Sequence, residues 1–284
     1  MTNSNTKKQL ENEFKNIKYI LTSTMRTRLL LSIYEDSKNL DDLRNELNKP
    51  SATILHGLKE LENINLVKKV QKYYQLTSNG YLLTTNMRKL IENWYSINKN
   101  KLFWNNHDLE DIPEDILKDI YLLKDAEYVN STTSDLSYAF NNFIKLISNA
   151  KSLKMILPIY SENHFKHIIN LLNNDTLEEL ELIISNDIFE SIKSNEFFNK
   201  ELMNNKKVKI FRVEKSLKLF LTFSKDFMSL TLFFKDGHYD DSQILISKTK
   251  NSIEWSRNLY DYYKVISWRM EPTTSKIKSW TIYY

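Results

Sequence analysis

Apolar side chains recur at every third or fourth position through the first hundred residues, the spacing of helices that bury one face. One helix is predicted from Lys8 to Leu21, and a second from near Thr24 to the polar run "DSKNL". A short third helix, "LDDLRNELN", follows and ends before Pro50. The pattern therefore predicts a helix, a short helix and a tight turn ahead of the next amphipathic segment.

That next segment, "SATILHGLKELEN", predicts a helix with one buried stripe. Ile54, Leu58 and Leu61 recur at positions i, i+4 and i+7, so they are expected in the core. Ser51 is expected to cap the start of this helix. Asn65 follows its end, where a left-handed residue is needed and Asn is the usual choice after Gly.

The stretch after this helix has the pattern of a β-hairpin. "LVKKVQKYYQL" is basic and strand-like, with a turn expected near Lys72, and Thr77 is expected to cap a long helix that ends near Phe103. Helix, turn, helix and then a basic hairpin is the winged-helix arrangement. The long helix is typical of a dimerisation or linking helix, or equally of a core helix.

From about residue 150 the apolar period changes to one that alternates strands and helices. The strands are expected at "LKMILPIY", "LEELELIIS", "KVKIFRVEK", "LKLFLTFS" and "FMSLTLFFKDG", and a final helix from Thr249 to about Trp268. This order predicts a parallel α/β core extended by an antiparallel hairpin, which makes a mixed sheet. The predicted fold is a winged helix-turn-helix at 1–80, linker or dimerisation helices at 81–125, an α/β effector domain at 126–270 and a tail at 271–284.

The composition indicates a cellular location and shows that charge is unevenly distributed along the chain. The 284 residues include no cysteine and no apolar run long enough to span a membrane, and the first residues are polar, so a cytoplasmic protein without a membrane partner is expected. Residues 1–100 hold 16 Lys and Arg against 10 Asp and Glu, whereas the remainder holds 24 against 26. A basic front half fits a module that binds a polyanion.

The polar face of the helix at 51–63 is the candidate surface for reading DNA. It lies opposite the Ile54 stripe, and the wing lysines and two arginines of the preceding helix extend it toward phosphates. For any one of these side chains, a solvated surface is the alternative, and Gly57 allows close approach either to DNA or to another helix. The predicted DNA-binding residues are Arg26, Arg28, Ser51, Thr53, His56, Lys59, Lys68, Lys69 and Lys72.

Enzyme chemistry finds little support in the sequence. His164 and His167 form an H-x-x-H without a third metal ligand, so both are interpreted as surface histidines. "HFK" begins like the phospholipase D signature, but Leu171 stands where that signature needs Asp. Gly-rich phosphate loops are absent. We expect no catalytic site, no metal and no cofactor.

A sensing site would instead need a crevice at the carboxyl ends of the predicted parallel strands. Those ends carry Tyr160, Ser161, Ser185 and Asn186, with two helix N-termini aimed at them. A small-molecule effector is expected there, and an anion would suit the site because helix N-termini attract anions.

The chain also resembles a known family. Residues 51–67 with "YYQLTSNG" resemble winged-helix regulators of the arsenic-repressor type, and Asn65 departs from the usual Gly. "FWNNHDLEDIP", "FSKDFMSLTLFFKDGHYDD" and "SIEWSRNLYDYY" resemble the effector domain of archaeal methanogenesis-regulator proteins. The resemblance covers about residues 10–268.

This resemblance implies a transcription regulator that binds double-stranded DNA and senses a ligand or a partner, and it marks Trp104 and His107 as ligand-binding or hinge residues. Its long helix implies a homodimer. The alternatives are a protein-interaction module with a vestigial winged helix and, more remotely, a phospholipase D-like phosphodiesterase.

Overall fold

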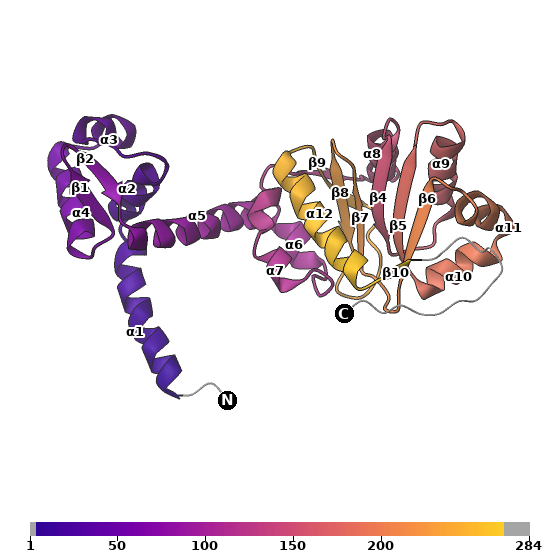
Figure 1. The fold of residues 1–284 in the computed structure, drawn as a ribbon, viewed down its shortest axis with the longest axis horizontal. Helices are drawn as coiled ribbons and strands as arrows, with labels where there is room; N and C mark the ends of the chain where they lie inside the picture. Colours follow the sequence, from indigo (N-terminus) through magenta and orange to yellow (C-terminus); the bar gives the residue numbers. More distant parts are fainter. Residues whose placement is uncertain (1–3, 270–284) are drawn as a thin grey trace. The chain divides into compact units, whose positions relative to one another are not determined.

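The computed structural model describes residues 4–269, so the predicted tail at 271–284 lies outside it. Within that range the chain folds as two units, the first ending at Glu92 and the second beginning at Asn93. Helix α5, Ser78–Lys99, runs through this boundary (Figure 1).

The first unit is a winged helix, as predicted. Its two-stranded hairpin gains a third, minimal strand, because Lys38 and Tyr74 exchange backbone hydrogen bonds of 3.2 and 2.8 Å. This bridge ties the segment between the second and third helices to the wing. The elements before α5 are α1 (Ser4–Leu21), α2 (Thr24–Glu35), α3 (Leu40–Leu47), α4 (Ser51–Asn63), β1 (Val67–Val70) and β2 (Tyr73–Leu76).

Helix α4 buries the stripe that its sequence predicts. Ile54, Leu58 and Leu61 are each at most 1% exposed and join the core of the first unit. Gly57 is also buried, and a Cβ there would lie 2.8 Å from Cδ1 of Leu29. The glycine is therefore explained by close packing of α4 on α2.

Two of the three helix caps predicted for α4 and α5 are present. Asn65 has a left-handed backbone, with φ of 57°, and Leu66 N–H donates to the Leu61 carbonyl over 2.9 Å, so the expected cap is confirmed. Thr77 also caps α5, since its Oγ1 accepts from Gly80 N–H over 3.0 Å. The expected Ser51 cap is wrong, because Pro50 occupies the cap position and Ser51 is the first helical residue.

The second unit is built on a mixed sheet, which confirms the predicted fold class. Among the described residues it has eight strands in the order β10-β6-β5-β4-β7-β8-β9-β3. The pairs β4–β5 and β5–β6 are parallel, and the others are antiparallel. The strands are β3 (Glu127–Asn130), β4 (Ser152–Leu157), β5 (Glu179–Ser185), β6 (Val208–Val213), β7 (Leu219–Phe223), β8 (Met228–Leu232), β9 (Gln243–Ser247) and β10 (Trp268–Arg269).

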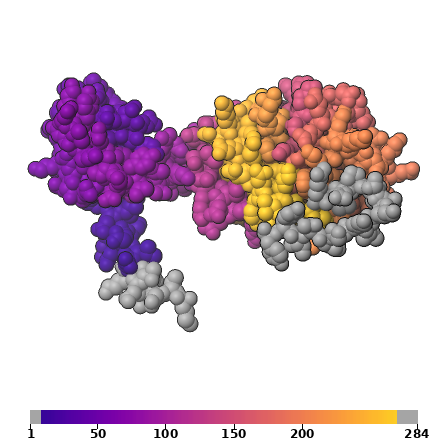
Figure 2. Space-filling model, viewed as in Figure 1, coloured from indigo at the N-terminus to yellow at the C-terminus, as the bar shows by residue number. Residues whose placement is uncertain are grey.

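Helices cover both faces of this sheet, so it has an apolar layer on each side (Figure 1). One face carries α8 (Tyr138–Ile147), α9 (Glu162–Asn173), α10 (Asn186–Ser194), α11 (Glu196–Phe198) and the π-helical turn η2 (Asn199–Met203). The other carries α6 (Lys101–Asn106), α7 (Glu114–Leu117), η1 (Ile120–Leu123) and α12 (Lys250–Val265). Helix α12 forms a continuous ridge on the surface in Figure 2.

Several elements depart from the sequence prediction. The single helix expected over 186–205 is interrupted at Asn195, whose Oδ1 accepts from Phe198 N–H over 3.1 Å and starts a new helix. The last helix ends at Val265, and Trp268 lies in a short edge strand. Strands β3 and β9 were not predicted.

The segment from 101 to 125, predicted as linker, packs into the second unit. Phe103, Trp104 and Leu123 are buried in the apolar layer beneath α12. The last turns of α5 join the same unit, because Ser96 Oγ donates to the Ile120 carbonyl over 3.0 Å. A dimerisation role for 81–125 stays a prediction.

Candidate nucleic-acid interface and effector site

The outward face of α4 is short and polar. Thr53, His56 and Lys59 are exposed on it, with Ala52 and Leu55 between them. The His56 side chain is 77% exposed, and its Nε2 lies 3.6 Å from Glu60. Ser51 is half-buried at the start of the helix. This face offers hydrogen-bonding and cationic side chains of a length that suits a major groove.

The wing carries its lysines on the surface. Lys68, Lys69 and Lys72 are all exposed, and Lys69 and Lys72 lie over the rings of Tyr74 and Tyr73, at 5.4 and 5.5 Å. Exposed cations on a hairpin are suited to phosphate contacts.

The two arginines of α2 differ in availability. Arg26 is engaged within the first unit: its Nη1 lies 2.9 Å from Glu60, its Nη2 donates to the Tyr19 carbonyl over 2.6 Å, and its side chain is 11% exposed. Arg28 is exposed and donates a 3.3 Å hydrogen bond to the Leu47 carbonyl. Arg28 is therefore the more accessible of the two arginines.

Four of the residues predicted to line an effector crevice contact their own neighbours, and their ligand-binding role stays a prediction. Ser185 is buried and caps α10 by accepting from Ile188 N–H over 3.4 Å. Asn186 Oδ1 accepts from Arg212 Nε and Nη2 over 2.9 and 2.8 Å. Ser161 lies 2.8 Å from Nδ1 of His164, and Tyr160 packs against aromatic rings of α9 and α11.

Trp104 and His107 lie in the interior, where they hold the fold. Trp104 is 8% exposed, and His107 is 1% exposed. His107 Nδ1 lies 2.7 Å from the Phe103 carbonyl, and its Nε2 lies 2.9 Å from Oδ2 of Asp240. Each ring nitrogen of His107 therefore lies within hydrogen-bonding distance of an oxygen, one from the backbone of α6 and one from the Asp240 carboxyl.

Asp240 is the partner that the sequence did not reveal, because 133 positions separate it from His107. Burial opposes ionisation of its carboxyl, but hydrogen bonds from His107 and Ser242 outweigh burial and hold the pKa of Asp240 below its ordinary value. The contact between His107 and Asp240 joins the segment after α6 to the segment between β8 and β9.

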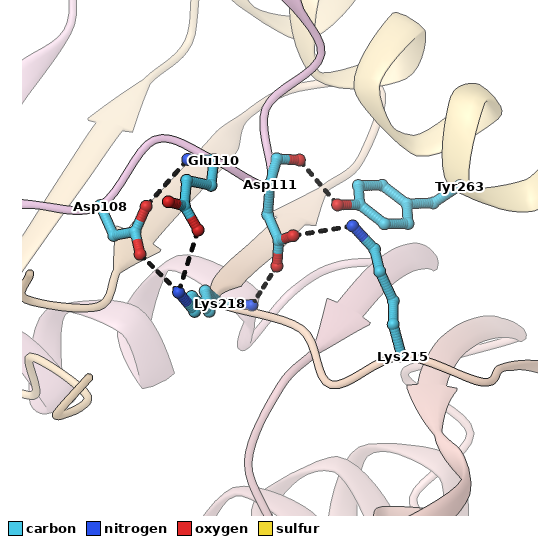
Figure 3. A network of polar contacts seen from close by, with 6 residues as sticks. All are labelled: Asp108, Glu110, Asp111, Lys215, Lys218 and Tyr263. Atoms are coloured by element: carbon cyan, nitrogen blue, oxygen red, sulfur yellow. Dashed lines mark hydrogen bonds and ion pairs between the residues drawn. The ribbon is translucent and has the colours of Figure 1, made fainter.

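A polar network fastens the segment next to His107 (Figure 3). Lys218 Nζ lies 2.6 Å from Asp108 Oδ2, and the hydrogen bond that it donates lowers the pKa of Asp108. Asp111 accepts from Lys215 Nζ and Lys218 N–H over 2.7 and 2.6 Å, and its carbonyl accepts from Tyr263 of α12. The role of this stretch is therefore to tie the chain after α5 to the sheet and to α12.

His164 is buried, so its interpretation as a surface histidine is wrong. It is 9% exposed, whereas His167 is exposed as predicted. Burial, with a smaller contribution from His167, lowers the pKa of His164 to about 4. His164 lines a cavity in the second unit that none of the six predicted effector residues reaches.

The sequence raised two kinds of chemistry near His164, a metal site and phosphodiester hydrolysis. Within 4–269 there is no group of three or more His, Asp or Glu side chains arranged to hold a metal ion. Lys166 points to the surface and pairs with Glu162 over 2.9 Å, away from the buried His164. In the same range, no helix has both the length and the apolar content of a bilayer span.

Comparison with known proteins gives two family matches. A family model described as the N-terminal domain of methanogenesis regulatory protein FilR1 matches residues 14–94, and one described as its middle domain matches residues 137–265. The methanogenesis regulatory protein FilR1 of Methanothrix harundinacea is 23% identical over 252 residues. That match covers 88% of this chain and 56% of the relative, so the chain spans little more than half the relative's length.

Solved structures give weaker likenesses. TrmBL2, described as an archaeal chromatin protein with a novel mode of DNA binding, is 12% identical, with a TM-score of 0.39 over 84% of this chain and 88% of its own. Phosphatidylserine synthase of Haemophilus influenzae is 13% identical, with a TM-score of 0.35 over 51% and 39% of the two chains. Both TM-scores are too low to establish a shared fold.

Proposed function

This chain belongs to the family of the methanogenesis regulatory protein FilR1, and we propose that it binds double-stranded DNA and regulates transcription. Matches to both an N-terminal and a middle domain of the same protein, in that order, are the basis of the family assignment. The relative is named a regulatory protein, which supports a regulatory role over an enzymatic one.

One observation carries the proposal: α4 is anchored by a buried stripe and presents the opposite face to solvent beside a lysine-bearing wing. On this face His56 is placed to contact a base edge or a phosphate, and Lys59 a phosphate. Thr53 and Ser51 add hydroxyls, and Lys68, Lys69 and Lys72 add wing contacts to the backbone. We do not include Arg26 among the proposed DNA contacts, because its guanidinium contacts Glu60 and the Tyr19 carbonyl.

The second unit is proposed as the effector domain of a cytoplasmic homodimer. Large apolar side chains on α5 remain exposed in one copy: Leu90 is 60%, Trp94 65% and Tyr95 56% exposed. On α1, Leu10 and Phe14 are 67% and 64% exposed. Stripes of this size on helices favour contact with a second copy over free solvent.

The test is a competitive mobility shift on the chain's own upstream region at near-physiological salt. Replacing both His56 and Lys59 with Ala should weaken specific binding by about tenfold or more, because base-edge contacts are lost. The matched control replaces Lys166 and His167 with Ala. Both residues are exposed on α9, and the control removes the same residue types as the α4 variant, one Lys and one His.

Circular dichroism of both variants must match that of the wild type. If the α4 variant binds as tightly as the control, α4 is not the reading helix. If neither the wild type nor the control prefers the upstream region to competitor DNA, the first unit is a vestigial winged helix and the proposal fails.

A further inference from the structure

The second unit contains a cavity of about 40 Å³ between the start of α8, His164 of α9 and strands β7, β8 and β9. Space of this size holds about three non-hydrogen atoms, judged by the room that buried waters need. The cavity is lined by Ala139, Phe140, Phe143, His164, Phe220, Ser229, Thr231, Tyr239, Asp240, Asp241, Gln243 and Ile244.

Aromatic rings make up much of its wall. The rings of Phe140, Phe143 and Phe220 surround His164, with centroids 4.9, 5.4 and 5.3 Å from the imidazole. Tyr239 adds a fourth aromatic ring from the turn after β8. The faces of such rings carry negative electrostatic potential, so they attract a cation that is brought out of water.

The charged groups on the lining have one sign. It includes two carboxylates, Asp240 and Asp241, and no Lys or Arg. Asp240 is buried and hydrogen-bonded to His107, whereas Asp241 is exposed at the cavity and forms no ion pair within the described part of the chain. His164 stays neutral near pH 7, because burial lowers its pKa to about 4. An anion is therefore disfavoured here, and a monovalent cation is favoured.

Polar groups that could receive N–H donors lie on the sheet. Ser229 and Thr231 are 2% and 5% exposed, and both line the cavity. The Ser229 hydroxyl makes no hydrogen bond with a residue of the described range. Because Ser229 lines the cavity, a guest with N–H groups could donate a hydrogen bond to its hydroxyl.

We propose that this cavity binds a primary ammonium group, either a small free amine or the head of a larger amine that enters through the open side. The aromatic rings would surround the cation, Asp241 would balance its charge, and Ser229 would accept one of its hydrogens. This inference rests on the proposed function in one respect: the bound amine would be the signal that the regulator senses.

Isothermal titration calorimetry on the full chain without DNA tests it, with ethylammonium chloride as the probe. Ethanol is the neutral counterpart of similar size, sodium chloride controls for ionic strength, and hexylammonium distinguishes a free small amine from the head of a longer one. Ethylammonium should bind saturably and ethanol should not. Tighter binding of hexylammonium assigns the larger guest, and equal or weaker binding assigns the small one.

Two variants probe the two sources of attraction. Asp241→Asn should weaken ethylammonium about threefold or more, since a partly screened charge is lost, and Phe140→Leu should weaken it by a similar factor through the lost ring face. Asp226→Asn is the matched control, because Asp226 is an exposed carboxylate of the same unit that does not line the cavity.

Binding of ethanol as tight as that of ethylammonium, no saturable binding of either amine, or equal losses in Asp226→Asn and Asp241→Asn would each overturn the proposal. Because DNA is absent, these results are independent of whether the first unit binds an operator. If the chain binds the amine but not DNA, the amine site is supported, but its role in regulating transcription is not.

Discussion

His164 lies among three phenylalanine rings, where water solvates its charged form poorly. Its pKa in the folded chain is therefore about 4, against an ordinary value of 6.5. Because the unfolded chain takes up this proton first, folding stability is fully present above pH 6.5 and falls as the pH drops toward 4. The loss across this window is roughly 3 kcal/mol, at 1.36 kcal/mol per pKa unit.

We predict that His164→Gln removes most of this pH dependence. Urea unfolding at pH 7 and pH 4.5 measures it, followed by tryptophan fluorescence, which reports the second unit because Trp94 is the first tryptophan in the chain. The exposed His167→Gln is the control and should behave as the wild type. Asp240 contributes little to the pH dependence between pH 7 and pH 4.5. Its pKa in the folded chain is below its ordinary value of 3.8, so the stability that its ionised form provides is lost only at lower pH. Identical pH dependence in His164→Gln and the wild type would contradict this account.

Single residues were predictable where a local pattern determines them. Ile54 and Leu58 follow helical spacing, and Asn65 follows the end of a helix, so both kinds of role were visible in the sequence. A DNA contact by Arg26 stays a prediction, but its partners Tyr19 and Glu60 were not visible in the sequence, because the packing of helices brings them to it. Asp240 was missed for the same reason, since only the folded sheet brings it to His107.

At the scale of elements, α4 and the wing are expected to contribute differently to DNA binding. Helix α4 would read bases, whereas Lys68, Lys69 and Lys72 would meet phosphates. Replacing the three lysines with Ala should weaken binding to all sequences alike. It should also make the slope of log K against log salt concentration shallower by about two to three units, since fewer counterions are released.

Mobility shifts at several salt concentrations, on specific and random duplexes, measure this slope. The matched control replaces three exposed lysines of the second unit, Lys145, Lys225 and Lys248. A wing variant that loses affinity for the specific duplex alone would show that the wing reads sequence. An unchanged slope would show that it does not touch DNA.

Element types were predicted better than element ends and partners. The parallel strands β4, β5 and β6 are segments of strand length that are rich in Leu, Ile and Val, which made them visible in the sequence. Strand β3 was missed because it is short and its sequence, "EYVN", has no clear strand pattern. It forms a strand by pairing with β9 at the edge of the sheet. The break at Asn195 depends on a side-chain cap, and helical periodicity does not reveal such a cap.

For the whole molecule, the exposed apolar side chains of α5 predict self-association. Replacing Leu90 and Trp94 with Ser should convert a dimer to a monomer, because both are more than half exposed in one copy and would be buried in two. Sedimentation equilibrium measures this change.

The control replaces Leu136 and Val265 with Ser, which are 78% and 84% exposed but lie on other elements. Dissociation by the control pair, or a wild-type chain that is monomeric at micromolar concentration, would contradict the assignment of α5. A monomeric wild type would also remove the reason to expect a symmetric operator.

The most direct test of the central claim is genome-wide footprinting of the full chain on DNA from its own genome, in parallel with the His56 and Lys59 double alanine variant. We predict that the protected sites share a two-fold-symmetric sequence, because half-site symmetry mirrors a dimer. We also predict that the variant loses these sites, while the Lys166 and His167 control retains them. Protected fragments without a common sequence, or the same sites in wild type and variant, would contradict a regulator that reads DNA with α4.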